Sequence, residues 1–138
     1  MQTTLALVQD EPKAKKVKLT GYVRGGDPTG TYLQTHIDAI YKDLVTVLGK
    51  PEDGEGYKVS GEWTLTDSDG NVVTLYDWKS TSLYDDSYPS VREFRSCTWE
   101  QTFNIGGCDP VVAETFRHNL ALELIKLKQK RQNRRSKK

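Results

Sequence analysis

The sequence has few of the residues that build disulfide scaffolds, metal sites or membrane spans. Its 138 residues include only two cysteines and two histidines. Cys97 and Cys108 lie far from any histidine cluster, so we expect two reduced thiols and no bound metal. No apolar run approaches the roughly 20 residues that a membrane helix needs. Residues 1–16 lack the basic start and apolar centre of a signal peptide, and these absences together predict a cytoplasmic protein.

Apolar residues are also scarce. They make up 36% of the chain, against roughly 45–50% in an average globular protein when glycine is counted as well. The length fits one domain. We predict a single small-cored domain over residues 17–127, with a flexible arm at 1–16 and a basic tail at 128–138.

The net charge of +1 conceals two segments of opposite charge. Residues 19–125 hold 17 acidic and 8 basic residues, whereas residues 126–138 hold eight basic residues and no acid. A basic run of this kind neutralises phosphates on nucleic acid, or it is a solvated end, or it folds back on the acidic domain. The candidate nucleic-acid-binding residues are Lys126, Lys128, Lys130, Arg131, Arg134, Arg135, Lys137 and Lys138. No aromatic residue accompanies them, so we expect attraction to the phosphate backbone without base stacking.

The spacing of apolar residues predicts the element order β-α-β-β-β-α. The first helix, over residues 31–48, rests on Leu33, Ile37, Ile40 and Leu44 at steps of three and four. The second begins at Asp109-Pro110, because Asp is a good N-cap and Pro suits the first helical position. The predicted strands cover residues 17–23, 59–65, 72–78 and 97–105, alternating between apolar and polar residues or, in 72–78, rich in β-branched and aromatic ones.

These elements predict an α+β domain. We expect a small, mainly antiparallel sheet with two helices on one face, followed by a disordered basic C-terminal tail. The strand over 72–78 is apolar on both faces, which is typical of a central strand. Residues 80–95, which connect this strand to the strand at 97–105, show no regular spacing of apolar residues. We expect an irregular segment there, with room for a short strand at its end.

This irregular segment is a candidate contact surface. Loops longer than about 12–15 residues are usually functional or disordered. Tyr84, Asp85, Asp86 and Tyr88 place aromatic rings among acids, and aromatic residues on a loop favour contact with a protein partner. The alternative is an ordinary surface loop.

Two turn-rich segments suggest ligand sites of different strength. Arg24, Gly25, Gly26 and Thr31 precede the first predicted helix, whose free N–H groups would attract a phosphate; a plain connector is the alternative. Residues 67–71 resemble a calcium loop, but the glycine stands at position four, so we predict a hairpin turn.

No catalytic constellation is visible in the sequence. His36 and His118 lie on the two predicted helices, and neither stands in a recognisable pattern with a nucleophile. We therefore predict a protein that is not an enzyme and that uses no cofactor and no metal.

The strand residues carry a resemblance to a family. Glu62-Trp63, the segment Val73-Thr74-Leu75-Tyr76-Asp77-Trp78-Lys79, and Asn104-Ile105-Gly106-Gly107 resemble the core of a family of small bacteriophage proteins, mostly of unassigned function. Residues 44–51 match the helix end that precedes that core. The resemblance covers roughly residues 20–118, although Asn104 stands where the family often has His. It implies a phage accessory protein that acts in the host cytoplasm.

Three functional hypotheses follow. The first is a non-enzymatic inhibitor that binds a host defence or nucleic-acid-directed protein, such as a CRISPR or restriction effector. The second is a nucleic-acid-binding accessory protein that uses the basic tail. The third is sequestration of a signalling nucleotide near Arg24–Thr31. The sequence leaves the oligomeric state open.

Overall fold

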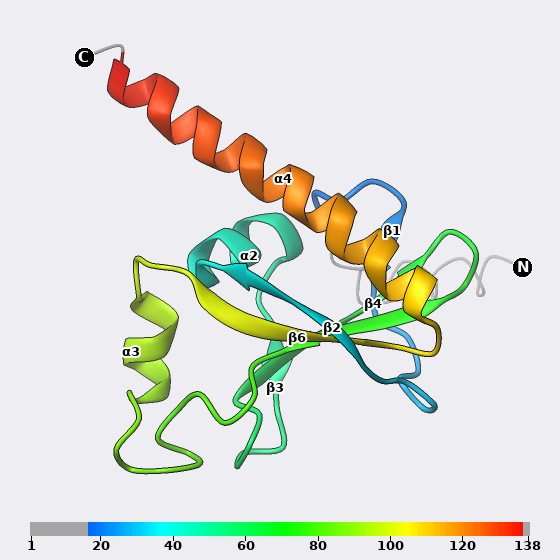
Figure 1. Ribbon diagram of the computed structural model, residues 1–138, viewed down its shortest axis with the longest axis horizontal. Coiled ribbons are helices and arrows are strands. Elements are labelled where there is room, and N and C mark those ends of the chain that lie inside the picture. The colour runs from blue at the N-terminus through cyan, green and yellow to red at the C-terminus, as the bar shows by residue number, and fades with distance from the viewer. Residues whose placement is uncertain (1–16, 137–138) are drawn as a thin grey trace, which may run out of the picture.

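The computed structural model describes residues 17–136 and contains a six-stranded antiparallel sheet with three helices. Five strands lie side by side in the order β1-β4-β5-β6-β2, and β3 pairs with β4 (Figure 1). The strands are β1 (Tyr22–Arg24), β2 (Tyr32–Ala39), β3 (Glu52–Asp53), β4 (Gly61–Asp67), β5 (Val72–Tyr76) and β6 (Gln101–Gly107). The helices are α2 (Tyr41–Leu48), α3 (Val91–Ser96) and α4 (Pro110–Ser136). The predicted α+β class with an antiparallel sheet is confirmed.

The core lies between the helices and one face of the sheet. Successive strand residues point to opposite faces, and the inward positions of the central strands are the apolar ones. The buried side chains of sheet and helices form one cluster, whose fully buried members include Trp63, Leu65, Leu75, Phe103, Ile105, Leu44, Leu48, Phe116 and Leu120. The opposite face carries polar side chains, among them Glu62 and Asn104. β5 is the middle strand, as its two-sided apolar pattern predicts.

The predicted helix over residues 31–48 is wrong in its first half. Residues 32–39 form β2, which pairs with β6, and only Tyr41–Leu48 are helical. Ile37 and Ala39 are buried while Asp38 between them is exposed, so the segment also has the two-residue period of a strand. Pairing with β6 sets Ile37 opposite Phe103 and covers an otherwise open strand. Tertiary pairing therefore overrides the helical spacing.

The predicted strand at 17–23 is shorter and faces the other way. Leu19 and Tyr22 are buried, whereas 54% of Val23 is exposed. Gly21 has a φ of 90°, and the Tyr22 N–H donates to the Leu19 carbonyl in a turn. This turn interrupts the alternation of apolar and polar residues that predicts the strand. The alternation therefore does not continue into β1, and only Tyr22–Arg24 pair with β4.

The predicted hairpin is confirmed as β4 and β5. Its register runs from Glu62 opposite Tyr76 to Thr66 opposite Val72. In the turn, an Asp67 carboxylate oxygen accepts hydrogen bonds from the N–H groups of Asp69 and Asn71. This carboxylate therefore closes the turn.

The C-terminal helix begins as predicted and ends much later. Asp109 accepts hydrogen bonds from the N–H groups of Val111 and Val112, as an N-cap should. The helix then continues to Ser136, so the predicted disordered tail is wrong over residues 128–136. Lys, Arg and Gln are good helix formers, and Arg131 is bonded to Asp43 of α2. Residues 137–138 and the predicted arm at 1–16 lie outside the described residues.

Two short elements escape the sequence prediction. β3 extends the sheet at Glu52 and Asp53, which none of the predicted strands covers. α3 occupies the end of the irregular segment, where we allow a strand. Its Ser90 N-cap and Glu93 form a reciprocal capping box, a helix signal present in the sequence.

Candidate binding surface

The rings of Tyr84 and Tyr88 belong to a larger cluster of aromatic and lysine side chains. Their ring centroids lie 6.2 Å apart, and Tyr84 lies 5.3 Å from the ring of Tyr57 in the β3–β4 loop. Trp78, just after β5, completes the group of rings. We call this set, together with two lysines, the aromatic–lysine surface: Tyr57, Lys58, Trp78, Lys79, Tyr84 and Tyr88.

The two lysines lie over the rings. The Lys58 ammonium is 5.9 Å from the ring centroid of Tyr57 and 5.7 Å from that of Trp78. The Lys79 ammonium is 5.7 Å from Trp78 and 5.1 Å from Tyr84. These distances are within the range of cation–π attraction. The lysines therefore connect the β3–β4 loop and the long β5–α3 connection into one surface.

Much of this surface faces solvent. The exposed fraction is 51% for Tyr57, 45% for Trp78 and 40% for Tyr88. Large aromatic side chains are usually buried in a core, and a group of them left half-exposed is typical of a contact surface.

The β4–β5 hairpin brings these loops together. Tyr57 and Lys58 precede β4, while Trp78 and Lys79 follow β5, so both pairs lie at the same end of the hairpin. The Lys79 N–H donates to the Lys58 carbonyl over 2.6 Å. Lys79 has a φ of 54°, a left-handed conformation that is uncommon outside glycine. Such residues persist where surrounding contacts hold them.

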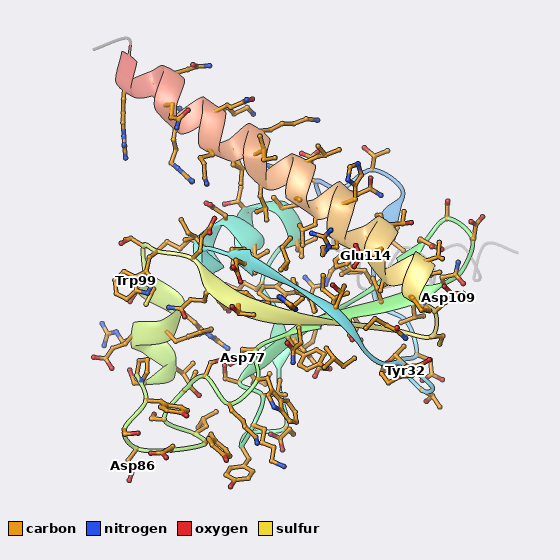
Figure 2. The ribbon with its side chains drawn as sticks, viewed as in Figure 1. Tyr32, Asp77, Asp86, Trp99, Asp109 and Glu114 are labelled. Carbon is orange, nitrogen blue, oxygen red and sulfur yellow. The ribbon has the colours of Figure 1, made fainter. Side chains whose placement is uncertain are left out.

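Asp77 fixes the hairpin end from below the surface. Its side chain is buried, with 2% exposed. One carboxylate oxygen accepts hydrogen bonds from the N–H groups of Ser60 and Gly61, and the other accepts from the Ser60 hydroxyl. Arg95 of α3 donates to the Ser60 carbonyl. Figure 2 labels Asp77 close to the end of the sheet strands.

Glu55 orders the loop that carries Tyr57 and Lys58. One of its carboxylate oxygens accepts hydrogen bonds from the N–H groups of Tyr57, Lys58 and Val59. Hydrogen bonds to the ionised form lower the pKa of the Glu55 carboxyl below its usual range. The loop is thus held by an ionised carboxylate at neutral pH.

The loop that carries Tyr84 and Tyr88 is folded on itself. The Tyr84 N–H donates to the carbonyl of the buried Thr81, and the Tyr88 N–H donates to the Asp85 carbonyl. The Asp85 carboxylate accepts from the N–H and hydroxyl of Ser87, which lowers the pKa of that carboxyl. Hydrogen bonds within its own loops therefore largely order the aromatic–lysine surface.

Two of the four predicted contact residues belong to the aromatic–lysine surface. Tyr84 and Tyr88 lie on the surface, Asp85 orders its loop, and Asp86 lies at the exposed tip (Figure 2). The prediction misses Tyr57-Lys58 and Trp78-Lys79. A signal was present in the sequence: one aromatic–lysine dipeptide precedes the first strand of the hairpin and another follows its second strand. Antiparallel pairing brings two such dipeptides together at the open end of the hairpin.

The predicted nucleic-acid-binding residues divide between two rows on α4. Arg131 donates two hydrogen bonds to the Asp43 carboxylate, and Lys128 forms an ion pair with Glu100 at 3.6 Å. Lys126 pairs with Glu123 of its own helix, and Lys130, Arg134 and Arg135 are exposed. Lys137 and Lys138 lie outside the described residues.

The predicted phosphate site lacks the helix on which it depended. Thr31 precedes strand β2, and its hydroxyl donates to the Pro28 carbonyl. The Arg24 guanidinium donates to the Leu48 carbonyl and to Glu52, and only 4% of its side chain is exposed. Gly25 and Gly26 lie beside β4, where a Cβ on Gly26 would meet the Thr66 hydroxyl at 2.5 Å. The four residues do not form an anion-binding cradle.

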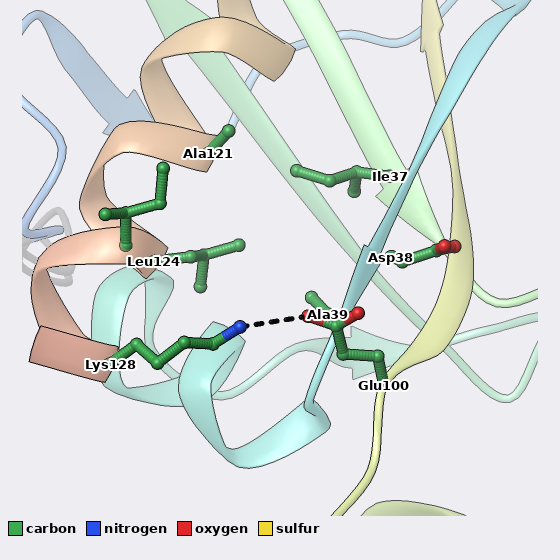
Figure 3. Close-up of a pocket in the computed structure, with 8 residues that line it drawn as sticks. Ile37, Asp38, Ala39, Glu100, Ala121, Leu124 and Lys128 are labelled. Atoms are coloured by element: carbon green, nitrogen blue, oxygen red, sulfur yellow. Dashed lines mark ion pairs between the residues drawn. The ribbon is translucent and has the colours of Figure 1, made fainter. Parts of the chain in front are cut away.

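A small cavity lies between α4 and the edge strand β2. Figure 3 shows Ile37, Ala39, Ala121 and Leu124 lining it, with the Lys128–Glu100 ion pair at one end. Its volume of about 140 Å³ is below the roughly 300–1,000 Å³ of typical ligand pockets. It is therefore a packing gap of the edge strand.

The described residues 17–136 hold no group of three or more His, Cys, Asp or Glu side chains that could bind a metal ion. Both cysteines are free thiols; Cys97 is buried and Cys108 exposed. His36 lies exposed on β2, and His118 lies exposed on α4. In the same residues, no helix is long and apolar enough to cross a membrane.

No protein-family model matches the chain, and no curated protein sequence matches it.

Proposed function

We propose that the protein is a non-enzymatic, phage-type binding protein that docks on a host protein through the aromatic–lysine surface. One observation carries the proposal: four aromatic rings and two ammonium groups from two loops form a single, half-exposed surface. Tyr and Trp are enriched among the residues that dominate binding energy at protein interfaces.

The chemistry of the surface also indicates its partner. The rings offer apolar anchors, and Lys58 and Lys79 match carboxylates on the partner. Asp85 and Asp86 lie at the margin and would repel a phosphate backbone, which favours a protein over nucleic acid here. The resemblance to small bacteriophage proteins supports a host factor in the cytoplasm, of a defence or nucleic-acid-directed system, as the target.

Site-specific photocrosslinking tests this proposal. A photoreactive phenylalanine at Tyr57 or Tyr88 should give a discrete protein adduct in bacterial cells, whereas the same residue at the still more exposed Trp99 should not. Trp78→Ala should reduce the Tyr88 adduct at least tenfold, because it removes a central ring. Equal adducts at Tyr88 and Trp99, or an adduct that nuclease removes, would contradict the proposal.

A further inference from the structure

The continuation of α4 as a helix sorts its cations into two rows. Consecutive helical residues are rotated by about 100°, and residues four apart lie on the same side. Lys126, Lys130 and Arg134 therefore form one row along the helix. Lys128, Arg131 and Arg135 form the other, rotated away from the first.

The second row is turned toward the acidic domain. Arg131 bonds to Asp43 and Lys128 pairs with Glu100, while Arg135 lies with Arg131 in a hollow that Asp43 also lines. The Arg131–Asp43 contact is the stronger of the two pairs, because only 12% of the Asp43 side chain is exposed, whereas Lys128 and Glu100 are both more than half exposed. The second row thus attaches the helix to its own domain.

The first row lies free of the domain's acids. Lys130 and Arg134 are exposed and form no ion pair within residues 17–136. Lys126 pairs only with Glu123 of the same helix, at 3.2 Å, and 66% of its side chain is exposed. Exposed pairs of this kind contribute about 0–1 kcal/mol, so a phosphate can replace Glu123. In Figure 1 the end of α4 extends well beyond the sheet and beyond α2.

We propose that this row, Lys126, Lys130 and Arg134, binds the phosphate backbone of duplex DNA. At about 1.5 Å per residue the row is about 12 Å long. Each strand of B-form DNA presents a phosphate every 3.4 Å or so of its axis, so the row faces three or four phosphates.

Two features select the duplex as the occupant. The last turns, residues 126–136, hold no aromatic residue, and single-stranded nucleic acid is usually held by stacking on aromatic rings. A straight helix fits the major groove of B-form DNA, about 12 Å wide, whereas the major groove of A-form RNA is deep and narrow. The contact is independent of base sequence, since phosphates carry none.

This site is independent of the aromatic–lysine surface. The loops that carry that surface lie far from the end of α4 in Figure 1. The rest of the domain is acidic and repels DNA, which confines the contact to the end of the helix.

Fluorescence anisotropy with a 30-base-pair duplex of random sequence tests the inference on the full chain. The logarithm of the binding constant should fall with the logarithm of salt concentration with a slope near −2.7, since each neutralised phosphate contributes about −0.9. The triple variant Lys126→Gln, Lys130→Gln and Arg134→Gln should weaken binding at least tenfold at 50 mM salt and flatten the slope. Its circular dichroism should match that of the parent chain.

A second triple variant provides the control of equal charge. Lys18→Gln, Lys50→Gln and Arg92→Gln also removes three exposed cations, but away from α4. It should keep the affinity within twofold. An equal loss in both variants would show attraction to net charge alone, and equal affinity for double-stranded RNA would contradict the groove geometry. Either result, or no measurable binding at 50 mM salt, overturns the proposal.

Discussion

At the scale of single residues, buried polar groups decide how the aromatic–lysine surface is held. Asp77 is the clearest case, because its carboxylate serves two backbone N–H groups and one hydroxyl. An unpaired buried group costs about 1–3 kcal/mol. Asp77 therefore fixes the backbone close to Lys58 and Trp78, two members of the surface.

Replacing Asp77 should destabilise the whole domain. Asp77→Ala leaves the N–H groups of Ser60 and Gly61 without their acceptor, and we expect the free energy of unfolding to fall by about 3 kcal/mol. Asp77→Asn keeps one acceptor oxygen and should lose about half as much. Urea denaturation measures both. Asp86→Ala, at an exposed loop tip, should stay within about 0.5 kcal/mol of the parent; a similar loss there would contradict the role given to Asp77.

At the scale of elements, one pair of like charges lies between strands β3 and β4, and one pair of opposite charges joins helices α2 and α4. Glu62 on β4 lies opposite Glu52 on β3. Burial, together with the charge of Glu52, raises the pKa of the Glu62 carboxyl. The folded state thus disfavours the ionised form of this side chain.

Glu62→Gln should consequently stabilise the protein at neutral pH. At pH 7 the Glu62 carboxyl is ionised in the folded and the unfolded state, and its charge is less favourable in the folded state. Removing the charge should therefore raise the free energy of unfolding by about 0.5 kcal/mol, the size expected for like charges on neighbouring strands. Below the ordinary pKa of the unfolded chain, the carboxyl is protonated in both states and the gain should vanish. Urea denaturation at pH 7 and pH 3.5 measures the difference. A gain that grows as the pH falls would refute the assignment.

The contact between α2 and α4 depends on a two-bond ion pair. Arg131 donates to both carboxylate oxygens of Asp43, over 2.7 and 3.1 Å, and 12% of the Asp43 side chain is exposed. A double-mutant cycle with Asp43→Asn and Arg131→Gln should give a coupling energy of about 1 kcal/mol. Thermal or urea denaturation of the four proteins suffices. A coupling near zero would mean that the long helix is held by its apolar residues alone.

At the scale of the whole molecule, α4 serves the domain along most of its length and extends beyond it at the end. Leu124 and Leu127 pack against the core, and Arg131 follows one turn later. Beyond Arg131 the described side chains are exposed. The structural part of the helix thus ends inside the segment that the sequence predicts as a tail.

Two truncations should separate these parts. A chain that ends at residue 133 keeps all these contacts, and its free energy of unfolding should stay within about 0.5 kcal/mol of the parent. A chain that ends at residue 125 loses Leu127 and Arg131, and should lose about 2 kcal/mol. Equal stability of the two chains would contradict the packing of the last turns. Only the first truncation is a clean test of the proposed DNA contact, since it removes Arg134 without unfolding the helix that carries Lys126.

Local signals in the sequence determine a large part of this fold. The β4–β5 hairpin follows from alternation and the Asp67–Asn71 turn, and the start of α4 follows from Asp109-Pro110. Each depends on neighbours a few residues away, and so each can be read from a short segment. The segregation of charge is likewise a property of the sequence alone.

Where the apolar residues of one segment fit both the helical and the strand spacing, only the tertiary structure decides between helix and strand. Residues 32–39 fit a helix or a strand, and pairing with β6 selects the strand because it buries Ile37 against a neighbour far along the chain. The same holds for the two candidate sites. Tyr57 meets Tyr84, and Arg131 meets Asp43, only after the hairpin and helices have packed. Long-range contacts of this kind cannot be read from one segment, so packing decides both which period an ambiguous segment adopts and which surfaces the elements form.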